Sequence, residues 1–422
     1  MKILVLGSGA REHAIVTALL AENADHEITV APGNAGIAHE VPCVTTDILD
    51  PEAVAFLAEG LDVDLVVVGP EAPLVAGVAD PLREMGIPVF GPNQAAAALE
   101  GSKTFAKRIM DEAGVPTGRA IKVSTLLDAE TALDDYGAPY VIKADGLAAG
   151  KGVLVTHDRD AAVAHASHYL TQGSVLIEEF LDGQEVSLFM FADGHDVLPL
   201  SPAQDFKRLK DNDEGPNTGG MGAYSPLPWL ADQFGSEDAF VTEVIETIAL
   251  PTVRQLEAEG TPFQGLLYCG LILTSKGIRV IEFNARFGDP ETQVVLPRLK
   301  TPLSELMLAS AEGTLAGRER PEFSNEAVVT VVLASENYPE TPVTGRVLIG
   351  IDDANSIEGV HVTHAATAVQ DGDLIATGGR VLSVVGRGAD FDEARSRAYE
   401  GLAKIQLEGG QFRTDIAKKV VK

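Results

Sequence analysis

The sequence predicts a multidomain protein of the α/β and α+β classes. Its 422 residues are enough for about three domains of ordinary size. Residues 1–102 alternate short apolar runs with helical segments, and each run ends in a glycine-containing turn, which is typical of a doubly wound parallel sheet. Residues 103–326 predict two α+β lobes, the smaller of which is inserted at about 120–192. Several short strands and one helix then predict a small α+β domain over 327–422.

Composition excludes several functional classes. Hydrophobic residues are 45% and charged residues 22% of the chain, as in ordinary globular proteins. The net charge of −30, from 62 acidic and 32 basic residues, disfavours nucleic-acid and anionic-membrane surfaces, because both require clustered bases.

The apolar run before Gly7 is too short for a signal peptide, and no run is long enough to cross a membrane. Cys43 and Cys269 lie among apolar neighbours and are expected in the core. We expect a cytoplasmic monomer with no nucleic-acid or membrane partner.

Four apolar runs in the first domain predict strands. The first is followed by the sequence GSGAREH and by an apolar-periodic helix that ends near Leu20. Because ligands of open α/β sheets bind at the carboxyl ends of the strands, we expect the turns after these runs to bind substrate. The runs and their turns lie at residues 3–6, 27–36, 64–74 and 87–92.

The first turn does not fit a dinucleotide-binding motif. Such a motif requires glycine at position 12, where this chain has Glu12, and the second strand ends in Ala31 and Pro32 without an acid for the ribose. A glycine turn at a helix N-terminus with Arg11 and His13 instead suits a single phosphate. The alternative is a tight strand–helix turn that binds nothing.

The second domain is expected to contain a glycine-rich loop for nucleotide phosphates. Gly150 and Lys151 resemble a Walker A loop only superficially, because Asp145 and Gly152 stand where that motif needs glycine and a hydroxyl residue. The loop joins two predicted strands, and its backbone amides together with Lys143 suit phosphates. A merely flexible hairpin is the alternative. The expected elements are a helix within 93–118, the strand–loop–strand unit at 138–155, a helix, two strands at 174–194, a long functional loop at 201–226, helical structure at 237–260 and two strands at 264–293.

An adenine site is also predicted after the glycine loop. The strand edge at Glu178–Leu181 can offer backbone groups to a purine, and Glu185 can accept hydrogen bonds from ribose hydroxyls. The signal is weak on its own, because acidic strand ends are common.

The stretch VIEFNARFGDPETQ, residues 280–293, carries the most specific chemistry. On an extended backbone Glu282, Asn284 and Arg286 share one face, while the phenylalanines between and after them face the other way. A carboxylate beside an amide oxygen suits a hard cation such as Mg²⁺, and the nearby guanidinium suits a transferring phosphoryl group. The alternative is the polar face of an edge strand. Asp289 and Glu291 add two acids at the end of the strand.

The third domain offers less functional signal. Short strands are expected within 327–388 and a helix at about 391–407. His361 and His364 have no third ligand evident in the sequence, so we expect a surface pair rather than a metal site.

Taken together, these motifs resemble the ATP-grasp superfamily and, within it, the glycinamide ribonucleotide synthetase family. The motifs are GSGAREH, APGNAG, VGPEAPLVAGVAD, FGP, EGSK, IKADGLAAGKGV, EEFLDGQE, GPNTGGMGAYSP, VIEFNARFGDPETQ and TGGRVLSV. The resemblance covers about residues 1–415. Departures are Phe206, where the family commonly has histidine, Ala285, where cysteine is frequent, and a slightly divergent tail.

The resemblance implies an ATP-grasp core of two lobes and a ligase of the second step of de novo purine synthesis. The γ-phosphoryl group of ATP would pass to glycine, and 5-phosphoribosylamine would attack the glycyl phosphate to give glycinamide ribonucleotide, ADP and phosphate. Glu282 and Asn284 would hold Mg²⁺ or Mn²⁺. The catalytic residues implied are Arg286, Lys143, Asp205 and Asp289. The ATP-binding residues implied are Lys103, Lys143, Gly146, Gly150, Lys151, Gly152, Glu178, Glu179, Phe180, Leu181 and Glu185. The substrate-binding residues implied are Gly9, Arg11, Glu12, His13, Asn34, Gly69, Pro70, Glu71, Thr218, Gly219, Gly220, Met221, Asp289 and Glu291.

Three other functions compete with this interpretation. Another ATP-grasp enzyme, such as a biotin carboxylase or a carboxylating or formylating purine enzyme, would share the ATP lobes but not the family-specific segments. A nucleotide-sensing regulator would not need Glu282, Asn284, Arg286, Lys103 and Lys143 together. An NAD-dependent oxidoreductase is disfavoured by Glu12.

Overall fold

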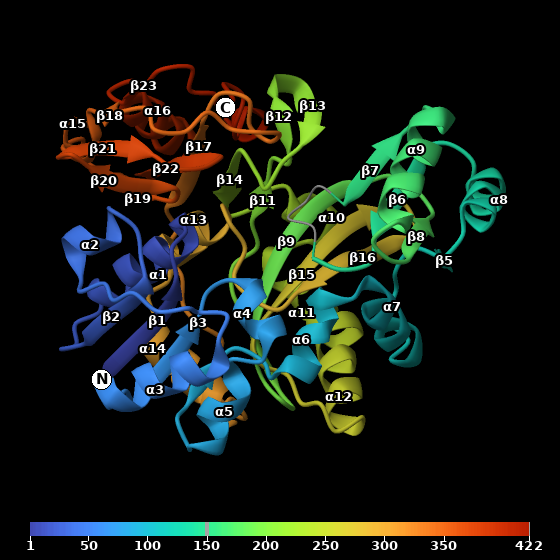
Figure 1. The fold of residues 1–422 in the computed structure, drawn as a ribbon, viewed down its shortest axis with the longest axis horizontal. Helices are drawn as coiled ribbons and strands as arrows, with labels where there is room; N and C mark the ends of the chain where they lie inside the picture. The colour runs from blue at the N-terminus through green and yellow to red at the C-terminus, as the bar shows by residue number, and fades with distance from the viewer. Residues whose placement is uncertain (148–151, 422) are drawn as a thin grey trace.

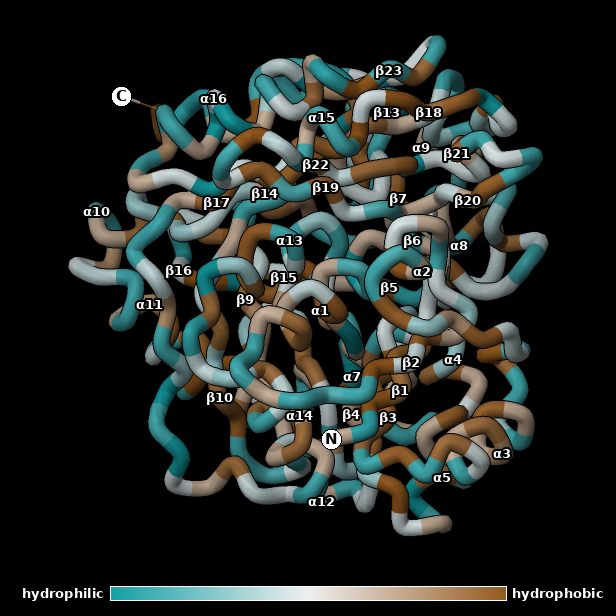
Figure 2. Tube along the Cα trace, turned by 90° about the vertical axis from the view of Figure 1, so that its left-hand side faces the viewer, coloured by the Kyte–Doolittle hydropathy of each residue, from teal (hydrophilic) through white to brown (hydrophobic). Residues whose placement is uncertain are grey.

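The computed structural model describes residues 1–147 and 152–421. An N-terminal sheet, a small lobe and a C-terminal sheet surround a central sheet that contains strands β9, β15 and β16 (Figure 1). Hydrophobic residues follow the interior strands, including β1 and β3 (Figure 2). Across the described ranges, no helix combines the length and the apolar character needed to cross a membrane.

The N-terminal sheet is parallel with the order β2-β1-β3-β4, which confirms the doubly wound prediction. Successive residues of β1 face opposite sides, so that Ile3 and Val5 pack with helix α1 while Leu4 and Leu6 belong to the core that contains helix α3. The strands are β1 (Lys2–Gly7), β2 (Glu27–Pro32), β3 (Leu65–Val68) and β4 (Val89–Phe90). The helices are α1 (Ala10–Leu20), α2 (Ile37–Glu40), α3 (Pro51–Leu61), α4 (Glu71–Ala76), α5 (Ala79–Glu84) and α6 (Gln94–Gly101).

The small lobe is a four-stranded sheet with a hydrophobic core of its own. Helix α7 (Lys103–Glu112) precedes it, and helices α8 (Leu126–Tyr136) and α9 (Arg159–Leu170) pack on its sheet. The strand order is β5 (Ala120–Val123), β8 (Val175–Glu178), β6 (Tyr140–Ala144) and β7 (Val153–Thr156).

The central sheet has the order β10-β9-β15-β16. The sequence placed β9 in the small lobe beside β8, but β9 pairs with β15 over ten residues. Its unbroken run of buried residues explains this, because a central strand is covered on both faces. The strands are β9 (Gln184–Asp193), β10 (Val197–Pro199), β15 (Gln264–Thr274) and β16 (Gly277–Asn284), and the nearby helices are α10 (Leu230–Phe234), α11 (Glu237–Val244), α12 (Leu250–Ala258), α13 (Thr292–Val295) and α14 (Leu303–Glu312).

The C-terminal sheet crosses the expected domain boundary at residue 327. Its order is β11-β14-β17-β22-β19, and β11 (Gln204–Asp205) and β14 (Gly222–Ser225) come from the segment expected to be a loop. That segment also contains the hairpin of β12 (Arg208–Lys210) and β13 (Glu214–Asn217). The remaining elements are β17 (Ala327–Ala334), β18 (Leu348–Ile349), α15 (Ile351–Asn355), β19 (Val360–His364), β20 (Thr367–Gln370), β21 (Asp373–Ala376), β22 (Arg380–Gly388), α16 (Phe391–Leu402) and β23 (Gln406–Leu407).

Candidate active site

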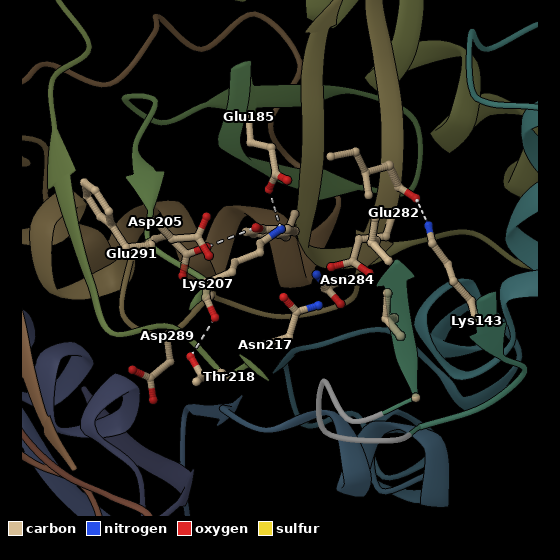
Figure 3. A pocket seen from close by; sticks show the side chains of 18 of the residues that line it. Lys143, Glu185, Asp205, Lys207, Asn217, Thr218, Glu282, Asn284, Asp289 and Glu291 are labelled. Atoms are coloured by element: carbon tan, nitrogen blue, oxygen red, sulfur yellow. Dashed lines mark hydrogen bonds and ion pairs between the residues drawn. The ribbon is translucent and has the colours of Figure 1, made fainter. Parts of the chain in front are cut away.

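A cavity of about 1240 Å³ lies where the N-terminal turns, the small lobe, the central sheet and the C-terminal domain meet. Figure 3 shows the polar side chains of several of these elements directed toward a common space. The predicted residues that line it are Arg11, Pro70, Glu71, Lys103, Lys143, Gly146, Gly152, Glu178, Glu179, Phe180, Leu181, Glu185, Asp205, Thr218, Gly219, Glu282, Asn284, Arg286, Asp289 and Glu291. The predicted Gly150 and Lys151 lie outside the described residues.

Glu282 and Asn284 end the edge strand β16, opposite Gly270 and Tyr268 of β15. Neither side chain has a hydrogen-bond or ion-pair partner within residues 1–147 and 152–421, although both line the cavity. Burial opposes the ionisation of Glu282, but lysines around the cavity hold its pKa below the ordinary value. An ionised carboxylate and an amide oxygen without protein partners fit a hard divalent cation.

Arg286 is held by two carboxylates. Its guanidinium contacts Glu71 at 3.1 Å and Glu100 at 2.9 Å. Glu100 also accepts a hydrogen bond from the amide of Ala285 at 2.7 Å. Burial opposes the charge of Arg286, but Glu100 and Glu71 raise its pKa, so the guanidinium stays charged beside the cavity. Sequence reasoning missed Glu100, whose only signal is its place before Gly101 in the EGSK motif.

Three lysines surround the nucleotide end of the cavity. Lys143 contacts Glu178 at 3.0 Å and donates to the carbonyl of Ile281 at 3.2 Å. Lys103 donates to the carbonyl of Gly146 at 3.0 Å. Lys107, which the sequence did not single out, contacts Glu178 at 3.3 Å. Burial lowers the pKa of Lys103 and of Lys107.

The predicted adenine edge borders an apolar part of the cavity. Strand β8 ends at Glu178, and the amide of Glu179 donates to the carbonyl of Arg119 at 3.0 Å. The apolar lining includes Ala106, Met110, Val141, Val155, Phe180 and Leu181, a composition typical of pockets for planar bases. Glu185, predicted for the ribose, forms an ion pair with Lys207 at 2.8 Å.

A group of acidic and hydroxyl side chains forms the opposite end. Glu291 accepts hydrogen bonds from Tyr268 at 3.0 Å and from Ser187 at 3.1 Å. Burial raises the pKa of Asp205. The positive charge of Lys207 lowers this pKa, and the negative charge of Glu291 raises it further. These groups offer hydrogen-bond acceptors to amines at that end of the cavity.

In the turn after β1, the polar side chains mainly contact other residues of the protein. Glu12 accepts a hydrogen bond from the amide of Gly9 at 2.6 Å and pairs with Arg11 at 2.5 Å. It packs under Gly69, where an added Cβ would collide with its carboxylate. His13 contacts Glu40 at 3.2 Å and accepts a hydrogen bond on Nδ1 from the amide of His364 at 2.8 Å. Of the predicted substrate residues, Glu12, His13, Gly69, Gly220 and Met221 line neither this cavity nor the smaller one next to it.

The prediction that His361 and His364 form a surface pair is wrong. His364 is buried and His361 is half-buried, because both face helix α1 across the contact between the first and third domains. Ligand atoms of His13, Glu40 and His361 lie within 4.8 Å of one another. However, Nδ1 of His13 accepts a backbone hydrogen bond, so a neutral ring carries its proton on Nε2 and donates it to Glu40. We interpret the group as an interdomain hydrogen-bond chain.

A smaller cavity of about 410 Å³ lies between the first turn and the C-terminal domain. Gly9, Asn34 and Asp289 of the predicted set line it, together with Thr367 and Arg380. Arg380 contacts the Asp289 carboxylate at 3.1 Å and donates to the Asp289 carbonyl at 2.6 Å. It also lines the larger cavity. Sequence reasoning missed Arg380 as a site residue, and its only signal was the TGGRVLSV motif.

Comparison with known proteins identifies close relatives over the whole chain. Profiles of phosphoribosylglycinamide synthetase match the N domain at residues 1–100, the ATP-grasp (A) domain at 101–292 and the C domain at 328–419. The phosphoribosylamine–glycine ligase of Leifsonia xyli is 69% identical over 99% of this chain and 100% of that protein. That of Streptomyces coelicolor is 56% identical over 99% of both chains.

Solved structures show the same relationship. The crystal structure of phosphoribosylamine–glycine ligase from Thermotoga maritima matches with a TM-score of 0.80 at 32% identity, covering 98% of this chain and 100% of that one. A biotin carboxylase from Campylobacter jejuni matches with a TM-score of 0.72 at 15% identity, covering 97% and 92% of the two chains, which indicates a shared fold alone.

Proposed function

The chain belongs to the phosphoribosylglycinamide synthetase family, and from this premise we propose that it is a phosphoribosylamine–glycine ligase. The reaction joins glycine to 5-phosphoribosylamine, with cleavage of ATP to ADP and phosphate, and supplies glycinamide ribonucleotide to purine synthesis. One observation carries the proposal beyond the family relationship: a single cavity joins the polar end of β16, three lysines and the turns of the first domain. The lysines would hold the polyphosphate of ATP, the apolar wall its base, and the opposite end the two amines.

The chain's own residues support a reaction in two steps. The glycine carboxylate attacks the γ-phosphorus, ADP leaves, and glycyl phosphate forms. The amine of phosphoribosylamine then attacks the acyl carbon, the C–O bond to phosphate breaks, and the proton that the nitrogen loses leaves with the phosphate. Both steps depend on positioning and on stabilising negative charge, for which Lys103, Lys143 and Arg286 are placed around the cavity. Asp205, Asp289 and Glu291 would orient the amines.

Glu282 and Asn284 would hold Mg²⁺ or Mn²⁺. When bound, such a cation neutralises phosphate charge and orients the phosphate groups. The absence of protein partners on both side chains within the described ranges supports this assignment.

The smaller cavity is proposed to bind the phosphate of phosphoribosylamine. Arg380 lies there, paired with Asp289, and the cavity lies at the N-terminus of α1, where backbone amides and the helix dipole favour anions. We further propose a monomer, with domains over 1–102, 103–326 and 327–422, the third of which completes its sheet with β11 and β14 of the second.

The function is tested by measuring ADP release with Mg-ATP and glycine, with and without phosphoribosylamine made in situ from ribose 5-phosphate and ammonia. We expect ADP only with all substrates present, together with a new ribonucleotide that contains glycine. ADP release with bicarbonate or formate instead would assign the chain to another ATP-grasp reaction. No ADP in any mixture would contradict an enzymatic function.

A further inference from the structure

The C-terminal segment, residues 411–421, packs against the hairpin β12–β13 at the edge of the large cavity. Figure 1 shows the C-terminus beside this hairpin. Hydrogen bonds join residues 413–415 to residues 208–213, about 200 positions earlier in the chain. The family relationship does not explain what this contact does for the site.

Arg413 is the centre of the contact. Its side chain is only 1% exposed. The guanidinium contacts Asp213 at 2.9 Å and donates to the carbonyl of Arg208 at 3.1 Å, both in the hairpin segment. Two parallel hydrogen bonds of 2.8 Å join it to Asp415. It also lies over the ring of Phe206, 4.8 Å from the ring centroid.

The neighbours of Arg413 extend the contact. Thr414 donates its amide to Asp211 at 2.8 Å, and its hydroxyl donates to the same carboxylate. Asp415 accepts a hydrogen bond from the amide of Asn212 at 2.8 Å. The two segments are therefore aligned residue by residue, and not merely in contact.

The C-terminal segment is fixed on its other side by helix α16 and the C-terminal sheet. Arg395 of α16 donates to the carbonyls of Thr414 at 2.6 Å and of Ile416 at 2.9 Å. Tyr399 donates to the carbonyl of Arg413 at 2.8 Å. Ile416 is fully buried against Gly222 of β14, where an added Cβ would lie 2.7 Å from its side chain. The segment therefore joins the rigid part of the third domain to the hairpin.

The hairpin segment carries cavity residues directly beside the residue that Arg413 covers. Asp205 and Lys207 flank Phe206, and both line the large cavity, as do Asn217 and Thr218 at the end of the hairpin. Figure 3 shows Asp205, Lys207 and Thr218 on one side of that space and Asn217 in its middle, beside Asn284. A shift of Phe206 would displace its two neighbours, because they share the same backbone.

We propose that Arg413 is a positioning residue, which holds the segment 205–218 in the geometry that the substrate amines require. The proposal rests on the proposed function and deepens it, because it gives the C-terminal segment a role in that site. Arg413 does not itself line the cavity in the described part of the chain. If the positive charge of Arg413 were removed, Asp211, Asp213 and Asp415 would repel one another across the contact. The hairpin would then no longer be held against the C-terminal segment.

The test compares Arg413→Met and Arg413→Lys with wild type. Lysine keeps the charge but loses the forked hydrogen bonds and the stacking on Phe206, so we expect a smaller effect. For Arg413→Met we expect kcat/KM for glycine to fall roughly 100-fold with a raised KM for glycine, while KM for ATP changes less than about threefold, because a displacement near 1 Å has such effects on positioned groups. Hydrogen–deuterium exchange in residues 206–217 should become faster.

Val384→Ala is the matched control. This buried residue lies in the C-terminal sheet and packs on α16, so its truncation lowers stability without removing any hydrogen bond or ion pair between the C-terminal segment and the hairpin. We expect its kcat/KM per folded molecule to match wild type. If Arg413→Met does not fold, Arg413→Lys and Asp213→Asn replace it, and their effects should be non-additive, because they remove the same contact.

Three results would overturn the proposal: unchanged glycine kinetics in the Arg413 variants, unchanged exchange in residues 206–217, or losses for all substrates that follow stability as in Val384→Ala. If wild type itself makes no ADP with any substrate, the proposed function fails. The positioning role is then judged by the exchange measurement alone, where faster exchange in the variants supports it and unchanged exchange contradicts it.

Discussion

The strands β1 and β16 both end in dense polar sequences beside the cavity, but the two sequences differ in what their side chains contact. At the end of β16, Glu282 and Asn284 have no hydrogen-bond or ion-pair partner within the described ranges. After β1, Glu12 caps the helix and pairs with Arg11, while His13 joins Glu40 to the third domain. The first group is available to a ligand, and the second is largely used by the fold.

This difference shows how to separate ligand-binding residues from structural residues of the same type. A buried polar group normally has a partner, because leaving it unpaired costs free energy. Glu282 is only half-buried, at the cavity, so it can lack a protein partner, and the charges of Lys207, Lys143 and Lys103 favour its ionised form. A carboxylate kept charged without a direct partner is suited to a cation that arrives with the substrate.

The strongest test of the comparison is Glu282→Gln. Replacing the charged ligand by a neutral amide should lower kcat/KM roughly 1000-fold, equal to about 4 kcal/mol, and should raise the Mg²⁺ concentration needed for half-maximal rate. Thermal unfolding should change less than activity, because no hydrogen bond or direct ion pair of the described residues is lost, only the longer-range attraction of the lysines. Steady-state kinetics over a Mg²⁺ series provide the measurement. Unchanged Mg²⁺ dependence would remove Glu282 from the metal site.

Arg286→Ala tests a residue that belongs to both kinds, ligand-binding and structural. Its side chain lines the cavity but is also paired with Glu71 and Glu100. We expect kcat to fall roughly 100-fold if the guanidinium stabilises the transferring phosphoryl group. KM for ATP should rise much less. Single-turnover measurements would show which step is slowed. A variant with normal kcat would assign Arg286 to a purely structural role.

Sequence reasoning predicted the parts of the site that depend on local pattern. The alternation in β16 placed Glu282 and Asn284 at the cavity, and the glycine turns located the ends of the parallel strands. It missed Glu100 and Lys107 because their roles depend on partners far along the chain: Ala285 is 185 residues from Glu100. The internal use of Glu12 could not be predicted either, because a capping carboxylate and a ligand carboxylate have the same sequence. His361 and His364 of β19 were wrongly predicted to lie on the surface, because a contact between two domains produces no periodic pattern in the sequence.

The interdomain histidines should make stability depend on pH. Burial, with the neighbouring His13, His39 and His361, lowers the pKa of His364 to about 3, and Glu40 only partly opposes this. Between pH 6.5 and pH 3 the unfolded chain therefore binds a proton that the folded chain does not, so stability falls as the pH decreases below about 6.5. At pH 5 the loss from this group is about 2 kcal/mol.

His364→Asn should make that pH dependence shallower, because asparagine does not titrate and can still reach Thr367. Chemical denaturation at pH 7.5, 6.5 and 5.5 measures the slope for both proteins. Equal slopes would show that His364 is protonated equally in the folded and unfolded chains. A shallower slope would support the distinction between the two strand ends, because replacing a ligand-binding residue at the end of β16 should leave the pH dependence of stability unchanged.

Glu12→Gln gives the smallest expected effect and tests the structural side of the comparison. Glutamine keeps the shape of the side chain beneath Gly69 but can accept from only one of the two donors, Gly9 and Arg11, with no charge to offer either. The free energy of unfolding should fall by about 1 kcal/mol, while kcat/KM falls less than about tenfold. Denaturation curves measured beside kinetics separate the two quantities. A large loss of activity at unchanged stability would place Glu12 with Glu282 among the ligand-binding residues, and the distinction between the two strand ends would then not hold.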